Sequence, residues 1–350
     1  MSRPRRLVLG AAAATVVGLV TGASVTAASA DTGPAPLVER QVTTGMGIPW
    51  GITFLPDGSA LVAERNSFRV VKVTQTGQKT VLGTVPGGSA GGEGGLLGLA
   101  VSPRFATDGL LFAYQTTGSG NRVVRIRVTG NSLGAPQNIV TGIPRSTFHN
   151  GGRLRFGPDG FLYASTGDAQ NGAQAQDRNS LAGKILRVTM DGAPAPGNPF
   201  GNRVYSMGHR NVQGLAFDSQ RRLWASEFGP STVDELNLIR AGGNYGWGGC
   251  STGNCIAPVR TWPVSQASPS GIAIVNDTIY MACLRGQRLF KMRIQGNGVQ
   301  TPQTLYNGTY GRLRTVEPSP VGGGLWLSTS NRDANGTPRP GDDRIIHISG

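Results

Sequence analysis

Short apolar segments separated by turn residues recur along most of the chain. In the clearest case the apolar stretches 50–55 and 60–64 flank the turn Pro56-Asp57-Gly58, and a stretch of alternating basic and apolar residues follows at 69–73. Short segments with a period of two predict β-strands, and a tight turn between two of them predicts a hairpin. The pattern therefore indicates antiparallel strands joined by short turns.

Several copies of this unit follow one another at intervals of about 40 to 60 residues, the range in which the blades of a β-propeller repeat. They cover residues 50–73, 97–128, 148–188, 214–239, 271–294 and 313–348. The sequence therefore predicts an all-β fold, a six-bladed β-propeller of four-stranded antiparallel blades. Residues 31–46 are expected to add a strand that helps to close the ring. A β-sandwich or a solenoid is the alternative.

The N-terminal residues have the pattern of an export signal. A basic head precedes a long Ala-rich apolar run, and a typical A-x-A cleavage site ends at Ala30. The pair Arg5-Arg6 ahead of the apolar run also permits twin-arginine export. We expect residues 1–30 to be a signal peptide and residues 31–350 to be a single propeller domain. This organisation predicts a secreted or periplasmic protein without a membrane span.

Composition and charge narrow the possible functions. The chain contains 54 glycines and 22 prolines, and only 15% of its residues are charged, which suits a fold with many tight turns. The formal net charge of +14 would suit nucleic acid, an anionic surface or an acidic small molecule as a partner. The arginines are scattered singly rather than clustered in lysine-rich runs. This distribution favours a solvated basic surface with a few functional arginines over a nucleic-acid interface.

The cysteines suggest one cross-link and one buried thiol. Cys250 and Cys255 flank a turn-forming loop that a disulfide could close in an oxidising compartment. Cys283 lies in an apolar predicted strand and is expected to be a small buried side chain. The spacing does not suit a cysteine-ligated metal.

One hairpin in the third unit carries the strongest candidate for catalysis. His149 stands just before its first strand and Asp168 just after its second, with the turn Pro158-Asp159-Gly160 between the strands. Strand pairing brings the outer ends of a hairpin together, so the two side chains could meet. A histidine oriented by a carboxylate is a common general base. The alternative is a structural histidine and an aspartate that merely opens a loop.

Arginines stand at strand ends in several other units. Arg210 precedes the fourth unit, Arg285 follows a strand of the fifth, and Arg312 and Arg314 begin the sixth. The loops that lead into the inner strands of a propeller crowd one face, where function is expected. Converging guanidinium groups would form a strong site for carboxylates, although each arginine alone is explained by surface solubility.

The fourth unit also contains an oxygen-rich turn. Gly229-Pro230 is followed by Asp234-Glu235. The backbone carbonyls of such a turn and nearby carboxylates are hard ligands that suit Ca²⁺, whereas acids in a loop are most often only solvated. No EF-hand spacing, serine nucleophile elbow, Walker loop or zinc-binding histidine pair is visible in the sequence.

Together these motifs resemble the soluble quinoprotein sugar dehydrogenases, the glucose/sorbosone dehydrogenase-like family. The resemblance covers nearly all of the chain after the predicted signal peptide. It rests on Glu93-Gly94-Gly95-Leu96-Leu97-Gly98-Leu99, the stretch from His149 to Asp168, Asn179-Ser180-Leu181-Ala182-Gly183-Lys184-Ile185-Leu186-Arg187, Gly208-His209-Arg210-Asn211, Glu227-Phe228-Gly229-Pro230, Asp234-Glu235-Leu236-Asn237 and Gly243-Asn244-Tyr245-Gly246-Trp247.

The resemblance implies a six-bladed propeller that holds pyrroloquinoline quinone (PQQ) and Ca²⁺ in a cleft and oxidises the C1 hydroxyl of aldoses to lactones. It implies that His149 removes the hydroxyl proton while hydride passes to the quinone, and that Asp168 orients His149. The carbonyls of Gly229 and Pro230 would ligate the Ca²⁺ that polarises the quinone. The implied cofactor-binding residues are Glu93, Arg210, Asn211, Arg285, Arg312 and Arg314. Glu235 and the carbonyl of Tyr245 match a second, structural Ca²⁺ site.

The chain departs from the family pattern at a few positions. Glu93 stands where a neutral amide is common, and Arg285 stands where a lysine is typical. The stretch 169–176 is only loosely matched, so Gln174 is a weak candidate for a cofactor contact. The short loops favour a monomer with an open cleft, which takes a sugar as substrate and passes electrons to an external acceptor such as a cytochrome or a quinone. The alternatives are a Ca²⁺-dependent lactonase-like hydrolase and a non-catalytic sugar-binding propeller.

Overall fold

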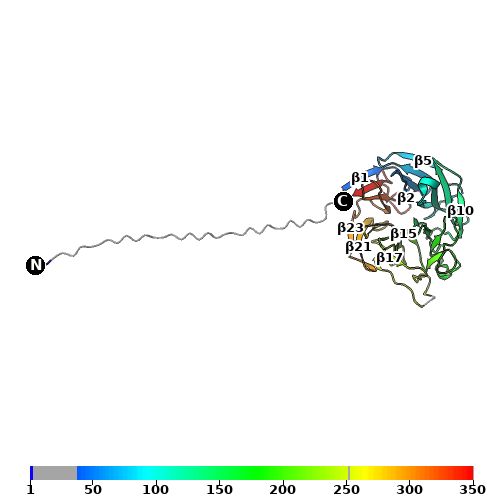
Figure 1. Cartoon of the computed structure of the whole chain (residues 1–350). Helices are drawn as coiled ribbons and strands as arrows, with labels where there is room; N and C mark the ends of the chain where they lie inside the picture. The colour runs from blue at the N-terminus through cyan, green and yellow to red at the C-terminus, as the bar shows by residue number, and fades with distance from the viewer. Residues whose placement is uncertain (3–37, 251–252, 350) are drawn as a thin grey trace. The chain divides into compact units, whose positions relative to one another are not determined.

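The computed structural model describes residues 1–2, 38–250 and 253–349. The predicted signal peptide and cleavage site lie outside these residues. Over the described part of the chain, the strands form six antiparallel sheets that follow one another around a ring, with β2 and β15 toward the centre and β5 and β10 at the rim (Figure 1). The chain is a six-bladed β-propeller, as the sequence predicts.

The strands of each blade follow one another from the centre outward. The first three blades consist of β2 (Pro49–Phe54), β3 (Ala60–Glu64), β4 (Arg69–Val73) and β5 (Lys79–Thr84); of β6 (Leu96–Val101), β7 (Leu110–Thr116), β8 (Asn121–Thr129) and β10 (Gln137–Ile143), with β9 (Ser132–Leu133) beside β8; and of β11 (Leu154–Phe156), β12 (Leu162–Ser165), β13 (Lys184–Val188) and β14 (Val204–Met207).

The last three blades follow the same plan. They consist of β15 (Val212–Phe217), β16 (Leu223–Glu227), β17 (Val233–Ile239) and β18 (Arg260–Pro263); of β19 (Pro269–Val275), β20 (Thr278–Cys283) and β21 (Arg288–Gln295), with β22 (Gly298–Val299) and β23 (Gln303–Leu305) both paired to β21; and of β24 (Leu313–Pro318), β25 (Leu325–Thr329), β26 (Ile345–Ser349) and β1 (Val38–Thr43).

The N-terminal strand closes the ring. β1 pairs antiparallel with β26 and so becomes the outer strand of the sixth blade, whose inner strand β24 contacts β2 of the first blade. This arrangement confirms the expected closing strand. It also places the first and last strands of the described chain in one blade.

Neighbouring blades pack backbone against backbone near the centre, and glycines make this possible. A Cβ atom added to Gly51 of β2 would lie 2.4 Å from the carbonyl oxygen of Leu97, and one added to Gly98 of β6 would lie 2.3 Å from that of Gly152. Farther out, apolar side chains from adjacent blades share one core, as Leu61 does with Leu111. Burial of each such side chain contributes about 1.5–3 kcal/mol.

The outer strands and two short helices are the elements that the sequence pattern does not mark. In β5, for example, most side chains face solvent, so no apolar alternation reveals the strand. The helices are α1 (Phe105–Asp108) and α2 (Gly172–Gln176), and α2 lies in the loop between β12 and β13. None of the helices in the described residues is long and apolar enough to cross a membrane.

The central channel contains buried arginines. Arg153 donates to the carbonyl of Gln213 at 2.8 Å and lies over the ring of Trp50, with its Cζ atom 4.3 Å from the ring centroid. Burial lowers the pKa of Arg153 to about 9, although Glu317 opposes the shift. The hydrolase alternative would need several carboxylates or amides in this channel, where the structure places Arg153 and Arg314, the latter donating to the amide oxygen of Gln213.

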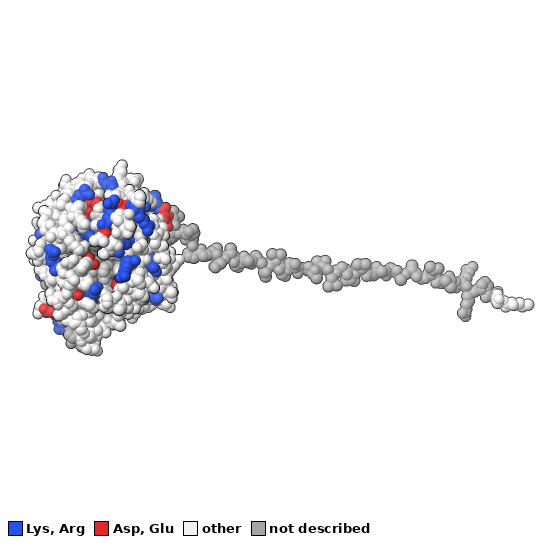
Figure 2. All heavy atoms as spheres, turned by 180° about the vertical axis from the view of Figure 1, so that it is seen from behind, with Lys and Arg blue, Asp and Glu red and all other residues white. Residues whose placement is uncertain are grey.

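Lys and Arg side chains are spread over the face of the molecule that Figure 2 shows, with few Asp and Glu among them. Many of the basic side chains lie in the upper middle part of this face, and others are scattered below them. This surface agrees with the sequence-based expectation of a solvated basic protein.

Candidate active site

Strand pairing in the third blade brings His149 and Asp168 together. β11 and β12 pair from Leu154↔Ala164 to Phe156↔Leu162, and the ladder continues with a hydrogen bond from the Gly152 N–H to the Ser165 carbonyl at 2.9 Å. Beyond it, His149 Nδ1 lies 2.8 Å from Asp168 Oδ1. The contact that the hairpin pattern predicted is therefore present.

Asp168 is held as an ionised acceptor. Its side chain is 2% exposed, against 15% for His149. Burial by itself would raise the pKa of Asp168, but hydrogen bonds from His149, from the Trp247 indole and from the Gln170 N–H outweigh burial and lower it. An ionised Asp168 requires His149 to carry its proton on Nδ1, so Nε2 of a neutral His149 is the basic nitrogen.

Glu93, in the loop that leads into the second blade, hydrogen-bonds to the backbone of His149 in the third blade. The Glu93 carboxylate accepts the backbone N–H of His149 at 2.8 Å and the side-chain amide of Asn211 at 3.1 Å. Asn211 is fully buried, and its Oδ1 atom accepts the N–H of Gly151 at 2.9 Å. Both residues thus hold the loop of His149, whose φ of 62° lies in the left-handed region that non-glycine residues rarely adopt.

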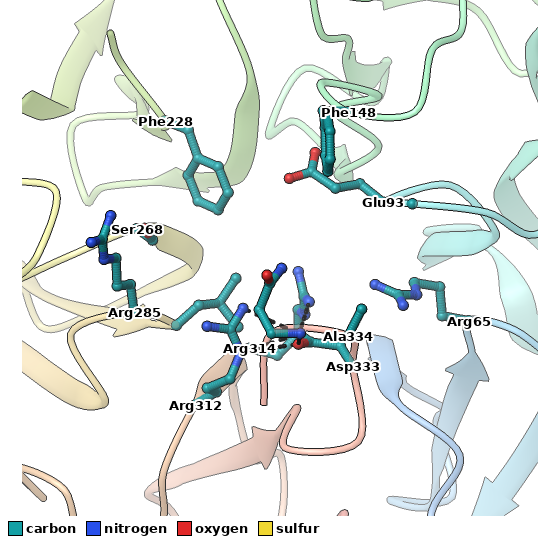
Figure 3. Close-up of a pocket in the computed structure, with 13 residues that line it drawn as sticks. Arg65, Glu93, Phe148, Phe228, Ser268, Arg285, Arg312, Arg314, Asp333 and Ala334 are labelled. Carbon is teal, nitrogen blue, oxygen red and sulfur yellow. Dashed lines mark hydrogen bonds and ion pairs between the residues drawn. The ribbon is translucent and has the colours of Figure 1, made fainter. Parts of the chain in front are cut away.

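A cavity of about 610 Å³ lies beside this loop. Figure 3 shows Glu93 and Phe148 on one side of it, with Arg65, Arg285, Arg312 and Arg314 around the remainder. These arginines come from the first, fifth and sixth blades. The cavity therefore gathers arginines that are far apart in the sequence, including three of the four that were expected to converge.

The arginines of this cavity share a counter-ion. Asp333 accepts from Arg314 at 3.0 Å and from Arg312 at 3.1 Å. Burial lowers the pKa of Arg314 to about 10, Asp333 opposes this shift, and Arg65 and Arg312 add to it. Arg285 is exposed and makes no ion pair within the part of the chain that the structure describes. The cavity thus keeps an excess of positive charge that suits an anionic ligand.

A second cavity, of about 240 Å³, contains the remaining predicted ligands. It is lined by Arg210, Glu227, Gly229, Pro230, Glu235, Tyr245, Gly246 and Trp247. Arg210 lies over the Trp247 ring, with its Cζ atom 5.3 Å from the ring centroid, and its buried Nε atom has no hydrogen-bond partner among the described residues. The resemblance implied two separate Ca²⁺ sites, but both sets of implied ligands line this one cavity.

Glu235 faces Glu227 across the strands β16 and β17. Burial and, next, the charge of Glu227 raise the pKa of Glu235 above its usual range. The side-chain amide of Asn237 donates to Glu235 at 3.1 Å, while the buried Oδ1 atom of Asn237 accepts no hydrogen bond from the residues that the structure describes. Within the described residues, no three His, Cys, Asp or Glu side chains form a metal-binding cluster, so a cation here would depend on backbone carbonyls.

Next to the second cavity lies a hydrogen-bonded Ser-His-Glu array. Its glutamate, Glu227, lines the cavity, but its serine and histidine are inaccessible. His209 Nε2 is 2.8 Å from the Ser206 hydroxyl, and His209 Nδ1 is 2.9 Å from Glu227 Oε2. Ser206 and His209 are completely buried, and His209 stacks on Tyr245. A hydrolytic nucleophile must reach its substrate, so this array is structural.

Comparison with known proteins places this site in a family. A family profile described as Glucose / Sorbosone dehydrogenase matches residues 46–337. The chain belongs to the glucose/sorbosone dehydrogenase family. Membership supports an oxidoreductase that acts on sugars.

Two solved structures and one further relative match most of this chain. The PQQ-bound aldose sugar dehydrogenase of Streptomyces coelicolor is 50% identical, with a TM-score of 0.85 over 90% of this chain and 99% of that one. An oxidoreductase (glucose dehydrogenase) of Thermus thermophilus is 41% identical, with a TM-score of 0.83 over 89% of this chain and 100% of its own. An aldose sugar dehydrogenase of Escherichia coli is 28% identical over 78% of this chain and 85% of its own.

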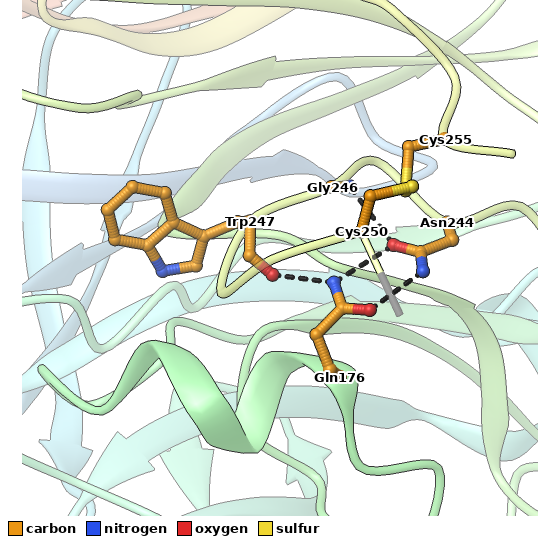
Figure 4. The surroundings of a disulfide bond; sticks show 6 residues. All are labelled: Gln176, Asn244, Gly246, Trp247, Cys250 and Cys255. Carbon is orange, nitrogen blue, oxygen red and sulfur yellow. Dashed lines mark hydrogen bonds between the residues drawn. A yellow bond between two sulfur atoms is a disulfide. The ribbon is translucent and has the colours of Figure 1, made fainter. Parts of the chain in front are cut away.

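In this member of the glucose/sorbosone dehydrogenase family, a disulfide lies next to the second cavity. Cys250 and Cys255 are bonded, and Cys283 is a buried free thiol, as the sequence suggested. Figure 4 shows the disulfide beside Gly246 and Trp247. Trp247 donates its indole N–H to Asp168 Oδ2 at 2.6 Å, so this loop reaches the candidate catalytic pair.

Sequence reasoning gave no role to Arg65, Asp333 or Trp247, although Trp247 ends one of the motifs on which the resemblance rests. Arg65 follows β3 and Asp333 follows β25, so both lie in the loop after the second strand of a blade, as Asp168 does. A search of the same loop in the other blades for charged residues would have found Arg65 and Asp333. Trp247 had no such signal, because Asp168, its partner, is 79 residues away. Gln174, the weak candidate, instead accepts a hydrogen bond from Ser180 at 3.1 Å.

Proposed function

We propose that this protein oxidises the C1 hydroxyl of aldose sugars to the lactone, with PQQ as cofactor and Ca²⁺ as its partner ion. We further propose that it works as an exported monomer and passes the electrons to an external acceptor. The observation that carries the proposal is the His149–Asp168 pair beside a cavity with several arginines. Similarity to a PQQ-bound aldose sugar dehydrogenase along nearly the whole chain adds support.

His149 is the proposed base. With Nδ1–H donated to ionised Asp168, Nε2 can take the proton of a sugar hydroxyl, and Asp168 stabilises the imidazolium that results. In the part of the chain that the structure describes, no hydrogen-bond partner occupies Nε2. PQQ, when bound, supplies the two-electron acceptor for the C–H bond that breaks.

The arginines fit a quinone with three carboxylates. Arg285, Arg312 and Arg314 offer planar donor sets to a carboxylate, and Arg65 adds positive charge to the same cavity. The unpartnered Nε atom of Arg210 also fits an acceptor in the neighbouring cavity. A buried donor without a partner costs about 1–3 kcal/mol, which a bound anion would recover.

The second cavity fits Ca²⁺. The carbonyls of Gly229, Pro230 and Tyr245 are the proposed ligands together with the Glu235 carboxylate, all of them hard oxygens. A cation would also relieve the repulsion between Glu227 and Glu235 that raises the pKa of Glu235. Ca²⁺ would supply Lewis-acid polarisation of the quinone.

Reconstitution tests the proposed function. Purified apoprotein incubated with PQQ and Ca²⁺ should reduce an artificial electron-acceptor dye when an aldose is added. Activity should require both additions, and the absorbance of PQQ should change on binding. PQQ binding without turnover on any of a panel of aldoses would favour a sugar-binding propeller. Lactone hydrolysis with Ca²⁺ alone would favour the hydrolase.

Calcium should stabilise the folded protein. At about 100 times its dissociation constant, Ca²⁺ should add about 2.7 kcal/mol to the free energy of unfolding of chelator-treated protein, seen as a higher melting temperature. Glu235→Gln should lose most of this gain, yet still fold, because burial already disfavours the charged form of Glu235. Asp191→Asn, at a side chain that is 78% exposed, is the control and should keep the full gain. An equal gain in the Glu235 variant would remove Glu235 from the metal site.

A further inference from the structure

Lys184 is a fully buried lysine at the start of β13. Its ammonium group donates to the carbonyls of Gln174 at 2.7 Å, Ala175 at 3.0 Å and Ala182 at 2.6 Å. An ammonium has three donors, so the three carbonyls satisfy it completely. The Lys184 side chain therefore links the start of β13 to three carbonyls of the loop before it.

Burial of the Lys184 charge costs free energy, which its hydrogen bonds to the three carbonyls must offset. Burial lowers the pKa of Lys184 to about 7, while Asp177 opposes the shift. No carboxylate forms an ion pair with Lys184 in the described residues, so its direct hydrogen-bond partners are backbone carbonyls. Lysine is rarely fully buried unless its charge is compensated in this way.

The carbonyls that Lys184 holds belong to the loop that carries Asp168. This loop runs from the end of β12 to the start of β13 and contains α2. Gln174 and Ala175 lie in α2, which has only five residues and no side-chain cap at its start. A helix this short is not stable by itself, so its position depends on such outside contacts.

A further set of hydrogen bonds leads from α2 to the catalytic pair. Gln176, the last residue of α2, donates to the Trp247 carbonyl at 2.6 Å and exchanges hydrogen bonds with Asn244 at 2.8 and 3.0 Å (Figure 4). Trp247 in turn donates its indole N–H to Asp168 Oδ2 at 2.6 Å. Asp168 is thus held from one side by Trp247 and contacts His149 on the other.

We propose that Lys184 is a positioning residue for the His149–Asp168 pair. It fixes α2, and through Gln176 and Trp247 it sets the orientation of Asp168 that keeps Nδ1 of His149 hydrogen-bonded. Within the described residues, the ammonium group of Lys184 donates to no residue that lines either cavity. Its effect on turnover rests on the function proposed above, but its effect on the geometry of the pair does not.

The direct test observes the hydrogen bond rather than activity. In ¹⁵N-histidine-labelled protein, the two imidazole groups bonded to carboxylates, His149 and His209, should each give a downfield Nδ1–H signal, and Asp168→Asn identifies that of His149. Lys184→Met should broaden or shift the His149 signal. The His209 signal serves for assignment only, because the His209 N–H donates to the carbonyl of Gly183, next to Lys184. An unchanged His149 signal in this variant would overturn the proposal.

Turnover supplies the second readout. In reconstituted enzyme, Lys184→Met should lower kcat about 10-fold or more, as displacements of catalytic groups by roughly 1 Å do, while the affinity for PQQ stays the same. In the Asp168→Asn background the same substitution should have little further effect, because both act on one contact. Equal losses in both backgrounds would mean that Lys184 acts elsewhere.

Two more variants keep the test decisive. If Lys184→Met does not fold, Gln176→Leu breaks the same chain of contacts at a half-buried residue and should perturb the same His149 signal; no perturbation would then overturn the proposal. Lys79→Met removes an exposed lysine that donates to one carbonyl, that of Thr44, and should change neither readout. If the wild-type protein lacked dehydrogenase activity, the proposed function would fail while the imidazole signals still decided the role of Lys184.

Discussion

His149→Ala should reduce sugar-dependent turnover by about 10²- to 10⁴-fold, the usual contribution of a positioned general base. The substitution removes Nε2 but keeps the backbone N–H that Glu93 accepts, so the loop retains this anchor. Within the described residues, the arginines of the large cavity form no hydrogen bond or ion pair with His149, so PQQ affinity should stay the same. Steady-state kinetics and an absorbance titration with PQQ measure the two quantities.

His347→Ala is the matched control. His347 lies on β26, where its imidazole contacts the Gly323 carbonyl at 2.7 Å, far along the chain from the candidate pair. This variant should keep normal turnover. Turnover in His149→Ala equal to that of the control would exclude His149 as the base, and loss of PQQ binding would give it a cofactor-holding role instead.

Arg312→Gln should weaken PQQ binding about 10- to 100-fold, because charge-assisted hydrogen bonds contribute about 1.5–3 kcal/mol each. Asp333 would still pair with Arg314, so the local fold should persist. At saturating PQQ, kcat should be close to that of the wild type, since the base and its partner are untouched. Titration of apoprotein with PQQ gives the dissociation constant.

Arg221→Gln removes an arginine outside both cavities, where it donates to the Pro158 carbonyl, and should bind PQQ normally. If the Arg312 and Arg221 variants bound PQQ equally well, the large cavity would not be the site of the carboxylates. A fall in kcat at saturating PQQ would instead indicate that Arg312 acts in turnover.

Without a bound anion, the concentration of positive charge in the large cavity costs free energy. Arg314 is buried, and its lowered pKa reflects poor solvation of its charge together with repulsion from Arg65 and Arg312. Asp333 offsets part of this cost, and its own pKa is lowered by Arg314 and Arg312 even though burial opposes that shift. Such a concentration of like charges is typical of a ligand site rather than of a structural core.

Local patterns in the sequence determine the fold and the contact between the two candidate catalytic residues. The period of two and the regular turns define six blades, and the glycines of the inner strands leave room for their neighbours. His149 and Asp168 meet because they end the same hairpin, and strand pairing over a few residues determines that contact.

Contacts between blades were decided only by the tertiary structure. That Arg285, Arg312 and Arg314 share a cavity with Glu93, whereas Arg210 lies with Glu235 in another, follows from where each blade stands in the ring. Asp333 as a shared counter-ion and Trp247 as a donor to Asp168 are likewise long-range. The physical reason is that a hairpin register is set by adjacent residues, whereas the distance between loops of different blades depends on the packing of the whole closed ring.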